Sequence, residues 1–307
     1  MTAFQGRDAV VVIPHYNDST RLGRCLSALA PQLAAAPQVA AIVVDNGSTG
    51  AEAEALAALR AAHPAVSFVT ETKKGAAEAR NRGVAETGGA EGPELICFLD
   101  CDCLPDPDWL ARALAIGATR LAPGGDADLV GGTITLFDET PGPRSGAEAF
   151  EAVFAFDNRG YIEQKGFSVT ANLLTRRAVF TATGPLIHGL SEDLEWCRRA
   201  VSKGFRLRHD DGLRVGHPSR SDWAALAKKW RRLTLESYGL TGGGAVARAT
   251  WALRALAMPV SALAHGPRVL RHPALSGPEK RAGLCTLARL RLARMGWMLR
   301  QAVTGRA

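Results

Sequence analysis

Long apolar runs, a secretory leader and dinucleotide-binding glycines are all missing from this sequence. No run of about 18 consecutive apolar residues occurs, so we expect no membrane-spanning helix. The first residues, MTAFQGRDAVVVIP, lack a basic start and a small-residue cleavage site, and do not predict a secretory signal. No GxGxxG follows an early strand, which argues against a Rossmann dehydrogenase.

Cysteine is infrequent, and no CxxC is present. The six cysteines lie mostly inside apolar segments, at positions 25, 97, 101, 103, 197 and 285. Such usage favours reduced thiols in the cytosol over a disulfide framework. We therefore expect a cytoplasmic protein.

Acidic residues are scarce in the last third of the chain. Residues 201–307 carry 20 Lys/Arg and 5 Asp/Glu, a net charge of +15, whereas residues 1–200 carry 17 and 25, a net charge of −8, and the two add to +7. With 47% hydrophobic residues, the chain can also form a sizeable core. The asymmetry predicts two parts, a main domain over 1–240 and a basic helical C-terminal extension over 241–307.

Apolar runs and helical stretches alternate in the first third. The runs are rich in β-branched residues and lack polar alternation, as a sheet covered on both faces requires. The predicted strands are 9–14, 40–45, 65–70 and 94–100, and the predicted helices between them are 18–34, 51–62 and 75–88. This order predicts an α/β fold with a Rossmann-like, mainly parallel sheet, whose functional loops follow the carboxyl ends of the strands.

The pattern is less regular after about residue 125. In order, we expect a strand over 127–137, a loop over 138–146, a strand and short helix over 169–184, a helix over 191–204, a hairpin or two short strands over 205–218, and a helix over 221–239. The Ala, Leu and Arg content of residues 245–303 predicts helices, which are interrupted at Pro259, Pro267, Pro273 and Pro278.

The segment FLDCDCLP, residues 98–105, places two carboxylates one residue apart after an apolar run. If the segment is extended, Asp100 and Asp102 share a face, and their repulsion favours a bound cation. Mg²⁺ typically takes one or two carboxylates together with phosphate oxygens. Two alternatives stay open: a solvated acidic turn, and a zinc site formed by Cys97, Cys101 and Cys103.

Six segments, in a fixed order, carry a resemblance to a known family. They are VVVIPHYNDSTRLGRCLSAL (10–29), AIVVDNGSTG (41–50), KGAAEARNRGV (74–84), CFLDCDCLPDPDWL (97–110), VTANLLTRRAVFTATG (169–184) and SEDLEWCRRAVSKG (191–204). Together they resemble the family 2 glycosyltransferases over about residues 8–220. The resemblance implies the GT-A fold and transfer of a sugar from a nucleoside diphosphate sugar to an acceptor hydroxyl, with inversion in most members of the family.

The resemblance implies a donor site at the first strand ends. Pro14, Tyr16 and Asn17 match the loop that lies against the nucleoside, and Asp45 matches the carboxylate that accepts the imide N–H of uracil or thymine. The implied donor is therefore a UDP- or dTDP-sugar. A simpler reading of Asp45 is an Asx-turn, and His15 is an unusual occupant to which we assign no role.

Three further matches concern the diphosphate. Arg80 and Asn81 match a segment that faces the nucleotide, although a surface arginine with a capping asparagine is the simpler reading. Asp100 matches a residue that holds ribose or metal-bound water. Asp102 matches a ligand of Mg²⁺ or Mn²⁺ that bridges the diphosphate.

The SEDLEW segment matches the position of the catalytic base. Asp193 is the implied general base and Glu192 orients the acceptor or the helix start, although acids at a helix N-terminus are also favoured by the helix dipole. His217 corresponds to a third metal or diphosphate ligand in some relatives, and a structural histidine is the alternative.

The basic tail allows two interpretations. In LCTLARLRLARMGWMLRQ, residues 284–301, leucines and methionines are spaced among arginines, as in a helix that lies on an anionic membrane surface. A helical cap on the catalytic domain or a dimer contact is equally compatible with this spacing. The first interpretation predicts peripheral attachment at the inner membrane face and a lipid-linked acceptor, whereas a soluble saccharide acceptor fits the second.

Other function classes receive less support. The tail has no recognised nucleic-acid motif, so we expect no nucleic-acid partner. A haloacid-type phosphatase places its DxD after the first strand, whereas here it follows about the fourth. The alternative of a different class is a non-catalytic relative that binds nucleotide sugar or acts as a scaffold, and the intact acidic residues argue against it.

Overall fold

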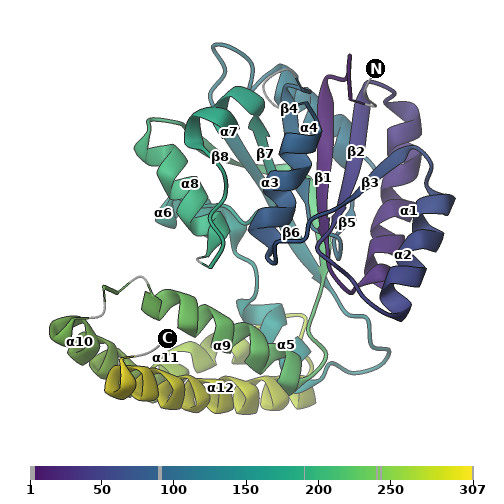
Figure 1. The fold of residues 1–307 in the computed structure, drawn as a ribbon. Helices are drawn as coiled ribbons and strands as arrows, with labels where there is room; N and C mark the ends of the chain where they lie inside the picture. The colour runs from purple at the N-terminus through teal and green to yellow at the C-terminus, as the bar shows by residue number, and fades with distance from the viewer. Residues whose placement is uncertain (1–3, 89–91, 190, 240, 243, 306–307) are drawn as a thin grey trace. The chain divides into compact units, whose positions relative to one another are not determined.

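The computed structural model describes residues 4–88, 92–189, 191–239, 241–242 and 244–305 (Figure 1). Their contacts divide the chain into two compact units, each described by itself below. The sheet unit comprises residues 1–135 and 157–217, and the helical unit comprises residues 136–156 and 218–307. This division differs from the boundary expected at residue 240, itself outside the described residues, because the helices before it pack with the C-terminal helices.

One mixed sheet with the order β3-β2-β1-β4-β7-β6-β8-β5 organises the sheet unit. Its first half is parallel and consists of β1 (Ala9–His15), β2 (Val39–Asp45), β3 (Val66–Thr70) and β4 (Leu95–Leu99). These are the four strands that the apolar runs predict. All residues of β1, β2 and β4 are buried, as expected for strands that helices cover on both faces.

The second half of the sheet contains antiparallel pairs. It consists of β7 (Asn172–Arg176), β6 (Leu129–Phe137), β8 (Leu207–Pro218) and β5 (Leu104–Pro105). β7 runs antiparallel to both β4 and β6, and β5 runs antiparallel to β8. The prediction of a hairpin or two short strands over 205–218 is wrong, because this segment forms the single strand β8.

Helices flank the sheet. They are α1 (Ser19–Ala35), α2 (Ala51–Ala62), α3 (Ala76–Glu86), α4 (Trp109–Ala118), α6 (Asn158–Lys165), α7 (Arg177–Thr183) and α8 (Glu192–Ser202). Side chains of β1, β2 and β4, including Val10, Ile42 and Phe98, form one core cluster with Trp196 of α8. Through this core, the helix that bears Asp193 is held in the same unit as the strands.

The helical unit contains the basic C-terminal part of the chain. It consists of α5 (Gly146–Phe154), α9 (Trp223–Gly239), α10 (Ala245–Leu256), α11 (Met258–Leu270) and α12 (Gly277–Thr304). The interruptions fall near the prolines: Pro259 and Pro278 stand in the first turns of α11 and α12, whereas Pro267 lies inside α11. None of the helices in the described ranges is both long and apolar enough to cross a bilayer.

Helix α12 is packed inside the helical unit. Leu287 and Leu290 are buried in a cluster with Phe150 of α5 and Leu226 of α9. The guanidinium of Arg289 lies 3.9 Å from the ring centre of Trp223, and that of Arg294 lies 4.7 Å from the ring centre of Trp230. Leu287, Leu290 and these two arginines therefore contribute to packing within the unit, whereas Leu292 of the same segment is exposed.

Close packing of α3 on the sheet yields a stability prediction. A Cβ built on Gly83 of α3 would lie 2.5 Å from Cγ1 of Val12, whereas one on Gly296 of α12 would meet nothing within 4 Å. We expect Gly83→Ala to lower the free energy of unfolding by about 1–3 kcal/mol, because overpacking outweighs the better helix propensity of alanine. Gly296→Ala should raise it by about 0.5–1 kcal/mol. Urea unfolding measures both, and a Gly83→Ala variant as stable as the wild type would contradict the close approach.

Candidate functional site

The site lies in the sheet unit, at the carboxyl ends of the parallel strands. His15 at the end of β1 is in register with Asp45 at the end of β2, and β4 ends one residue before Asp100. Because these strands run in the same direction, their ends meet at one edge of the sheet. The matched register brings together residues that are 30 to 85 positions apart in the sequence.

Asp45 is held by two neighbours. Its Oδ1 accepts hydrogen bonds from Ser48 Oγ at 2.6 Å and from His15 Nδ1 at 3.2 Å, and its Oδ2 accepts from the Ser48 backbone N–H at 3.1 Å. The backbone N–H of Asp18 donates to His15 Nε2 at 3.2 Å, which places the imidazole proton on Nδ1. The geometry includes the Asx-type turn that the sequence allowed, and it adds His15, to which the sequence analysis assigned no role.

Two hydrogen bonds connect the loop after β1 to the loop after β2. The backbone N–H of Asn17 donates to Ser48 Oγ at 2.9 Å, and its side-chain Oδ1 accepts from the Thr49 N–H at 3.2 Å. Asn17 has a φ of 49°, which asparagine tolerates better than most residues. Pro14 is buried in β1, whereas the exposed ring of Tyr16 faces Lys74 Nζ at 4.4 Å.

A second group surrounds the buried guanidinium of Arg80. NH2 of Arg80 lies 2.5 Å from Asp100 Oδ1, and NH1 lies 3.3 Å from Glu192 Oε1. Burial alone would lower the pKa of Arg80, but the charges of Asp100, Glu192 and Asp193 raise it on balance. The arginine thus lies among three carboxylates instead of on the open surface.

Asp193 is the carboxylate of the site whose pKa best suits a general base. Burial, followed by the charge of Glu192, raises the pKa of Asp193 to about 6, although the N–H of Leu194 and the charge of Arg80 act in the opposite direction. A carboxylate in this range is ionised at neutral pH and is a stronger base than an ordinary aspartate.

Asp102 lies beside His217. Asp102 Oδ2 is 3.3 Å from Nε2 of His217, which is buried at the end of β8. Burial raises the pKa of Asp102, and the neighbouring His217 partly offsets this effect. The segment that carries Asp100 and Asp102 is not extended, as their expected position on one face required. Residues 100–103 instead form a turn, which is closed by a hydrogen bond from the Cys103 N–H to the Asp100 carbonyl.

Within the described residues, no group of three or more His, Cys, Asp and Glu side chains is arranged to hold a metal ion. Burial also raises the pKa of Cys97 to about 12, so this thiol stays protonated. The zinc alternative therefore gains no support from the described part of the chain. Asp102 and His217 are the two predicted ligands that lie together.

Asn81 has a structural partner. Its side-chain amide donates to the Leu186 carbonyl and accepts from the Leu186 N–H, both at 2.9 Å. These bonds fix part of the loop that precedes α8. Asn81 therefore holds the loop that leads to the helix of Asp193, and its predicted contact with the nucleotide stays a prediction.

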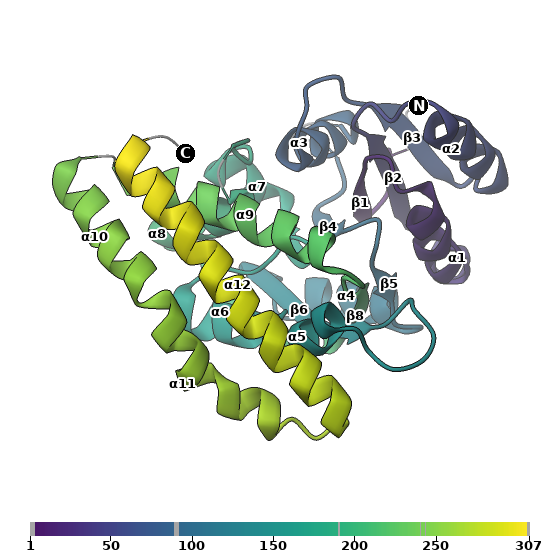
Figure 2. The same ribbon diagram turned by 90° about the horizontal axis from the view of Figure 1, so that it is seen from below.

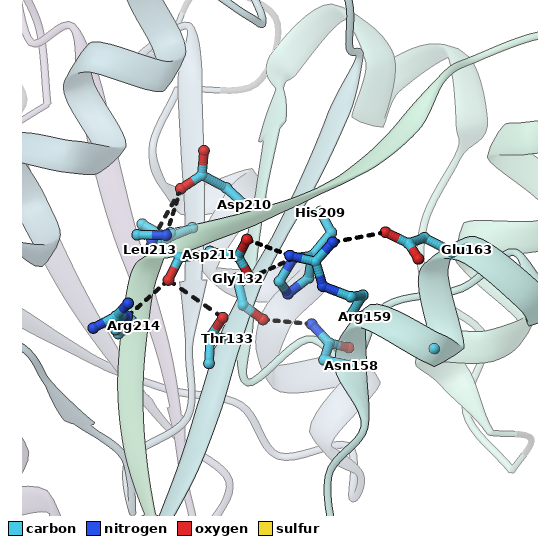
Figure 3. Close-up of polar contacts among 12 residues, drawn as sticks. Gly132, Thr133, Asn158, Arg159, Glu163, His209, Asp210, Asp211, Leu213 and Arg214 are labelled. Atoms are coloured by element: carbon cyan, nitrogen blue, oxygen red, sulfur yellow. Dashed lines mark hydrogen bonds and ion pairs between the residues drawn. The ribbon is translucent and has the colours of Figure 1, made fainter.

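The strand that carries His217 is fixed by a polar cluster that the sequence did not reveal. Figure 3 shows Arg159 between Glu163 and Asp211, and it forms ion pairs with both. On the same strand, Asp210 Oδ1 accepts from the Gly212 and Leu213 backbone N–H groups at 3.0 Å. Asp210 also pairs with Arg112 of α4 at 2.9 Å. These contacts hold β8, and so contribute to the position of His217.

Comparisons with known proteins agree with this arrangement. A family model described as glycosyl transferase family 2 matches residues 10–186. Glycosyltransferase AglE of Haloferax volcanii is 29% identical over 224 residues, which cover 72% of this chain and 70% of that protein.

Solved structures share the fold. The mannosyltransferase PcManGT from Pyrobaculum calidifontis, in complex with GDP-Man and Mn²⁺, has a TM-score of 0.55 at 17% identity and covers 98% of this chain and 74% of that one. Glucosyl-3-phosphoglycerate synthase from Mycobacterium tuberculosis has a TM-score of 0.50 at 18% identity, with coverages of 77% and 79%.

The family match spans more than half of the chain and contains the ends of β1, β2 and β4. The mixed sheet with flanking helices confirms the predicted α/β class, and the structural neighbours are glycosyltransferases. The chain therefore belongs to glycosyl transferase family 2 and is a glycosyltransferase of the GT-A fold.

Proposed function

We propose that the enzyme transfers a sugar from a UDP- or dTDP-sugar to an acceptor hydroxyl with inversion at the anomeric carbon. The observation that carries this proposal is the raised pKa of Asp193, about 6, beside the group formed by Arg80, Asp100 and Glu192. A single base that deprotonates the acceptor favours direct displacement of the leaving diphosphate, and such a displacement inverts the centre.

In this proposal Asp193 removes the proton from the acceptor hydroxyl. Glu192 keeps the pKa of Asp193 high through its charge and holds Arg80 at 3.3 Å. Asp193 stands in the first turn of α8, where a helix N-terminus also favours carboxylates. The dipole accounts for acids at this position but not for the raised pKa, which supports a catalytic role.

Asp45 is proposed to read the base of the donor. Among its hydrogen bonds within the described residues, Oδ1 accepts from Ser48 Oγ and His15, whereas Oδ2 accepts only the Ser48 N–H. One acceptor position on Oδ2 suits the single imide N–H of uracil or thymine. Guanine offers two adjacent donors, and the engaged Oδ1 disfavours such a bidentate pair. Tyr16, Pro14 and Asn17 would line the nucleoside side of this position.

Arg80 and Asp100 are proposed to face the diphosphate and ribose. The Nε–H of Arg80 is buried and has no hydrogen-bond partner among the described residues. An unpaired donor is costly, and a phosphate oxygen is a suitable acceptor for it once the guanidinium shifts, because this atom is closed to solvent in the described structure. Asp100 pairs with NH2 of the same guanidinium and keeps it in place.

A divalent metal fits the pair of Asp102 and His217. One carboxylate and one imidazole, with the diphosphate oxygens, form a suitable ligand set, and the imidazole nitrogen favours Mn²⁺ over Mg²⁺. When bound, the ion would neutralise charge on the departing diphosphate. Asp100 is already engaged by Arg80, so we assign it to the donor and not to the metal. Mn²⁺ in the complex of PcManGT with GDP-Man supports this choice.

The acceptor is proposed to be a saccharide or a lipid-linked saccharide used in cell-surface glycan synthesis. The basic C-terminal part supports a cytoplasmic enzyme attached peripherally to an anionic inner membrane face. A non-catalytic nucleotide-sugar-binding or scaffold protein would not need a carboxylate with the raised pKa of Asp193, which disfavours that alternative.

Asp193→Asn tests the proposed base. We expect the variant to retain donor binding but to lose at least about 100-fold in kcat for donor hydrolysis, with water as the acceptor, because the amide accepts no proton. In the wild type, kcat should fall as the pH drops below about 6, where Asp193 becomes protonated. Glu192→Gln should move this acid limb to lower pH, since the charge of Glu192 raises the pKa. An Asp193→Asn variant with more than about a tenth of the wild-type rate would exclude an essential base.

Asp102→Ala tests the metal site. Calorimetric titration of UDP should lose its dependence on Mn²⁺ in this variant and in His217→Ala. Asp108→Ala, which changes an exposed aspartate at the start of α4, serves as the control and should titrate like the wild type. Equal Mn²⁺ dependence in wild type and Asp102→Ala would remove Asp102 from the metal site.

The preference for the donor base is also measurable. We expect UDP to bind at least about tenfold more tightly than GDP, because one acceptor position is left on Asp45. Asp45→Ala should weaken UDP binding by about tenfold and leave GDP binding nearly unchanged. A wild-type enzyme that prefers GDP would show that Asp45 does not select the base in this way.

A further inference from the structure

An exposed apolar row runs along α10 and α11 of the helical unit. Its members are between 54% and 82% exposed and are Val246, Leu253, Leu256, Val260, Leu263 and Leu270. They account for half of the exposed large apolar side chains among the described residues. Large exposed apolar patches usually mark an interaction surface.

The row is continuous because the two helices are nearly continuous. Only Ala257 separates α10 from α11, and its φ of −75° and ψ of −13° remain helical. Spacings of three, four and seven residues keep the row on one side of both helices. Figure 2 shows α10 and α11 following one another along α12, on which both helices pack. Trp251 and Val269 are buried, so the opposite side of each helix forms the internal face.

The charges near the row have one sign. Arg254 and Arg271 are exposed on α10 and at the end of α11. Arg268 of α11 is also exposed, and its guanidinium lies 5.5 Å from the ring centre of Phe154 in α5. Residues 237–278 contain no Asp or Glu. The row and its arginines, which we call the α10–α11 face, therefore combine apolar side chains with uncompensated positive charge.

This combination distinguishes between two occupants. A second copy of the chain, docked face to face by a two-fold axis, would bring arginines against arginines without a carboxylate from either face. An anionic lipid surface complements the arginines and accepts the leucines and valines between its headgroups.

We propose that the α10–α11 face docks the enzyme on an anionic lipid bilayer. The inference rests on the membrane attachment in the proposed function and assigns it to a defined surface. It also separates the attachment from α12, whose Leu287 and Leu290 are packed inside the unit.

The experiment is co-sedimentation of the full chain with vesicles of phosphatidylglycerol and phosphatidylcholine in equal amounts, and with phosphatidylcholine alone. The test variant is Leu253→Gln/Leu263→Gln, and the charge variant is Arg254→Gln/Arg271→Gln. The matched control is Leu235→Gln/Leu292→Gln, which changes two exposed leucines of α9 and α12 outside the row. Thermal unfolding and lipid-free donor hydrolysis are measured on every variant.

We expect the wild type to bind the anionic vesicles and not phosphatidylcholine. Both the test variant and the charge variant should lower the partition coefficient by about tenfold, while the control stays within about twofold of the wild type. Binding should weaken between about 0.1 M and 1 M salt, as the Debye length falls from about 10 Å to 3 Å.

Three results would overturn the proposal. They are wild-type affinity in the folded test variant, equal binding to both kinds of vesicle, and a lipid-free dimer that the test variant dissociates. The last result would identify a second copy as the occupant. Failure of the wild type to hydrolyse any donor would instead contradict the proposed transferase activity, and the sedimentation result would still decide the role of the face.

Discussion

The buried ion cluster of Arg80 is the constraint on which the site depends. A guanidinium removed from water requires compensating charge, and here Asp100 after β4 and Glu192 of α8 supply it. These two residues are separated by more than 90 positions, so the cluster ties the DxD turn to the helix of Asp193. The charges that satisfy the arginine also influence the pKa of Asp193. One contact network thus supports the fold and, after burial, modifies the pKa of the proposed catalytic residue.

The parallel half of the sheet was predictable because its signal is local. Strands β1, β2 and β4 are continuous runs of buried residues, and burial on both faces requires such runs. β3, at the edge of the sheet, is only partly buried and contains Ser67 and Thr70, but its β-branched residues still indicated a strand. The antiparallel half of the sheet was harder to predict from the sequence. β5 has two residues, and β8 contains Arg208, Asp210 and Asp211 within a strand, so charged side chains obscured its continuity. Residues 138–146 were expected as a loop, and α5 begins at their end with a capping box of Ser145 and Glu148, a local signal that the sequence analysis did not use.

The site residues were predictable as types but not as contacts. The positions of Asp45, Asp100, Asp102 and Asp193 follow from strand ends and ordered motifs, whereas their partners depend on pairs that are distant in sequence. Asn81 binds the backbone of Leu186, 105 positions away, and no local pattern indicates this. His15 was missed for the same reason, because its importance comes from β1 and β2 being in register. The only local signal for a role of His15 was its position directly after Pro14, at the end of the predicted first strand.

The basic tail shows why composition alone does not locate a binding surface. Arg289 and Arg294 stack on tryptophans, and Arg248 donates to the backbone carbonyls of Ala302 and Val303. These arginines therefore contribute to packing within the helical unit. The same division applies to the leucines, since Leu287 and Leu290 are buried while Leu253 and Leu263 are exposed. Periodicity identifies an apolar row on each helix, but only the packing of α12 against its neighbours determines which row remains at the surface.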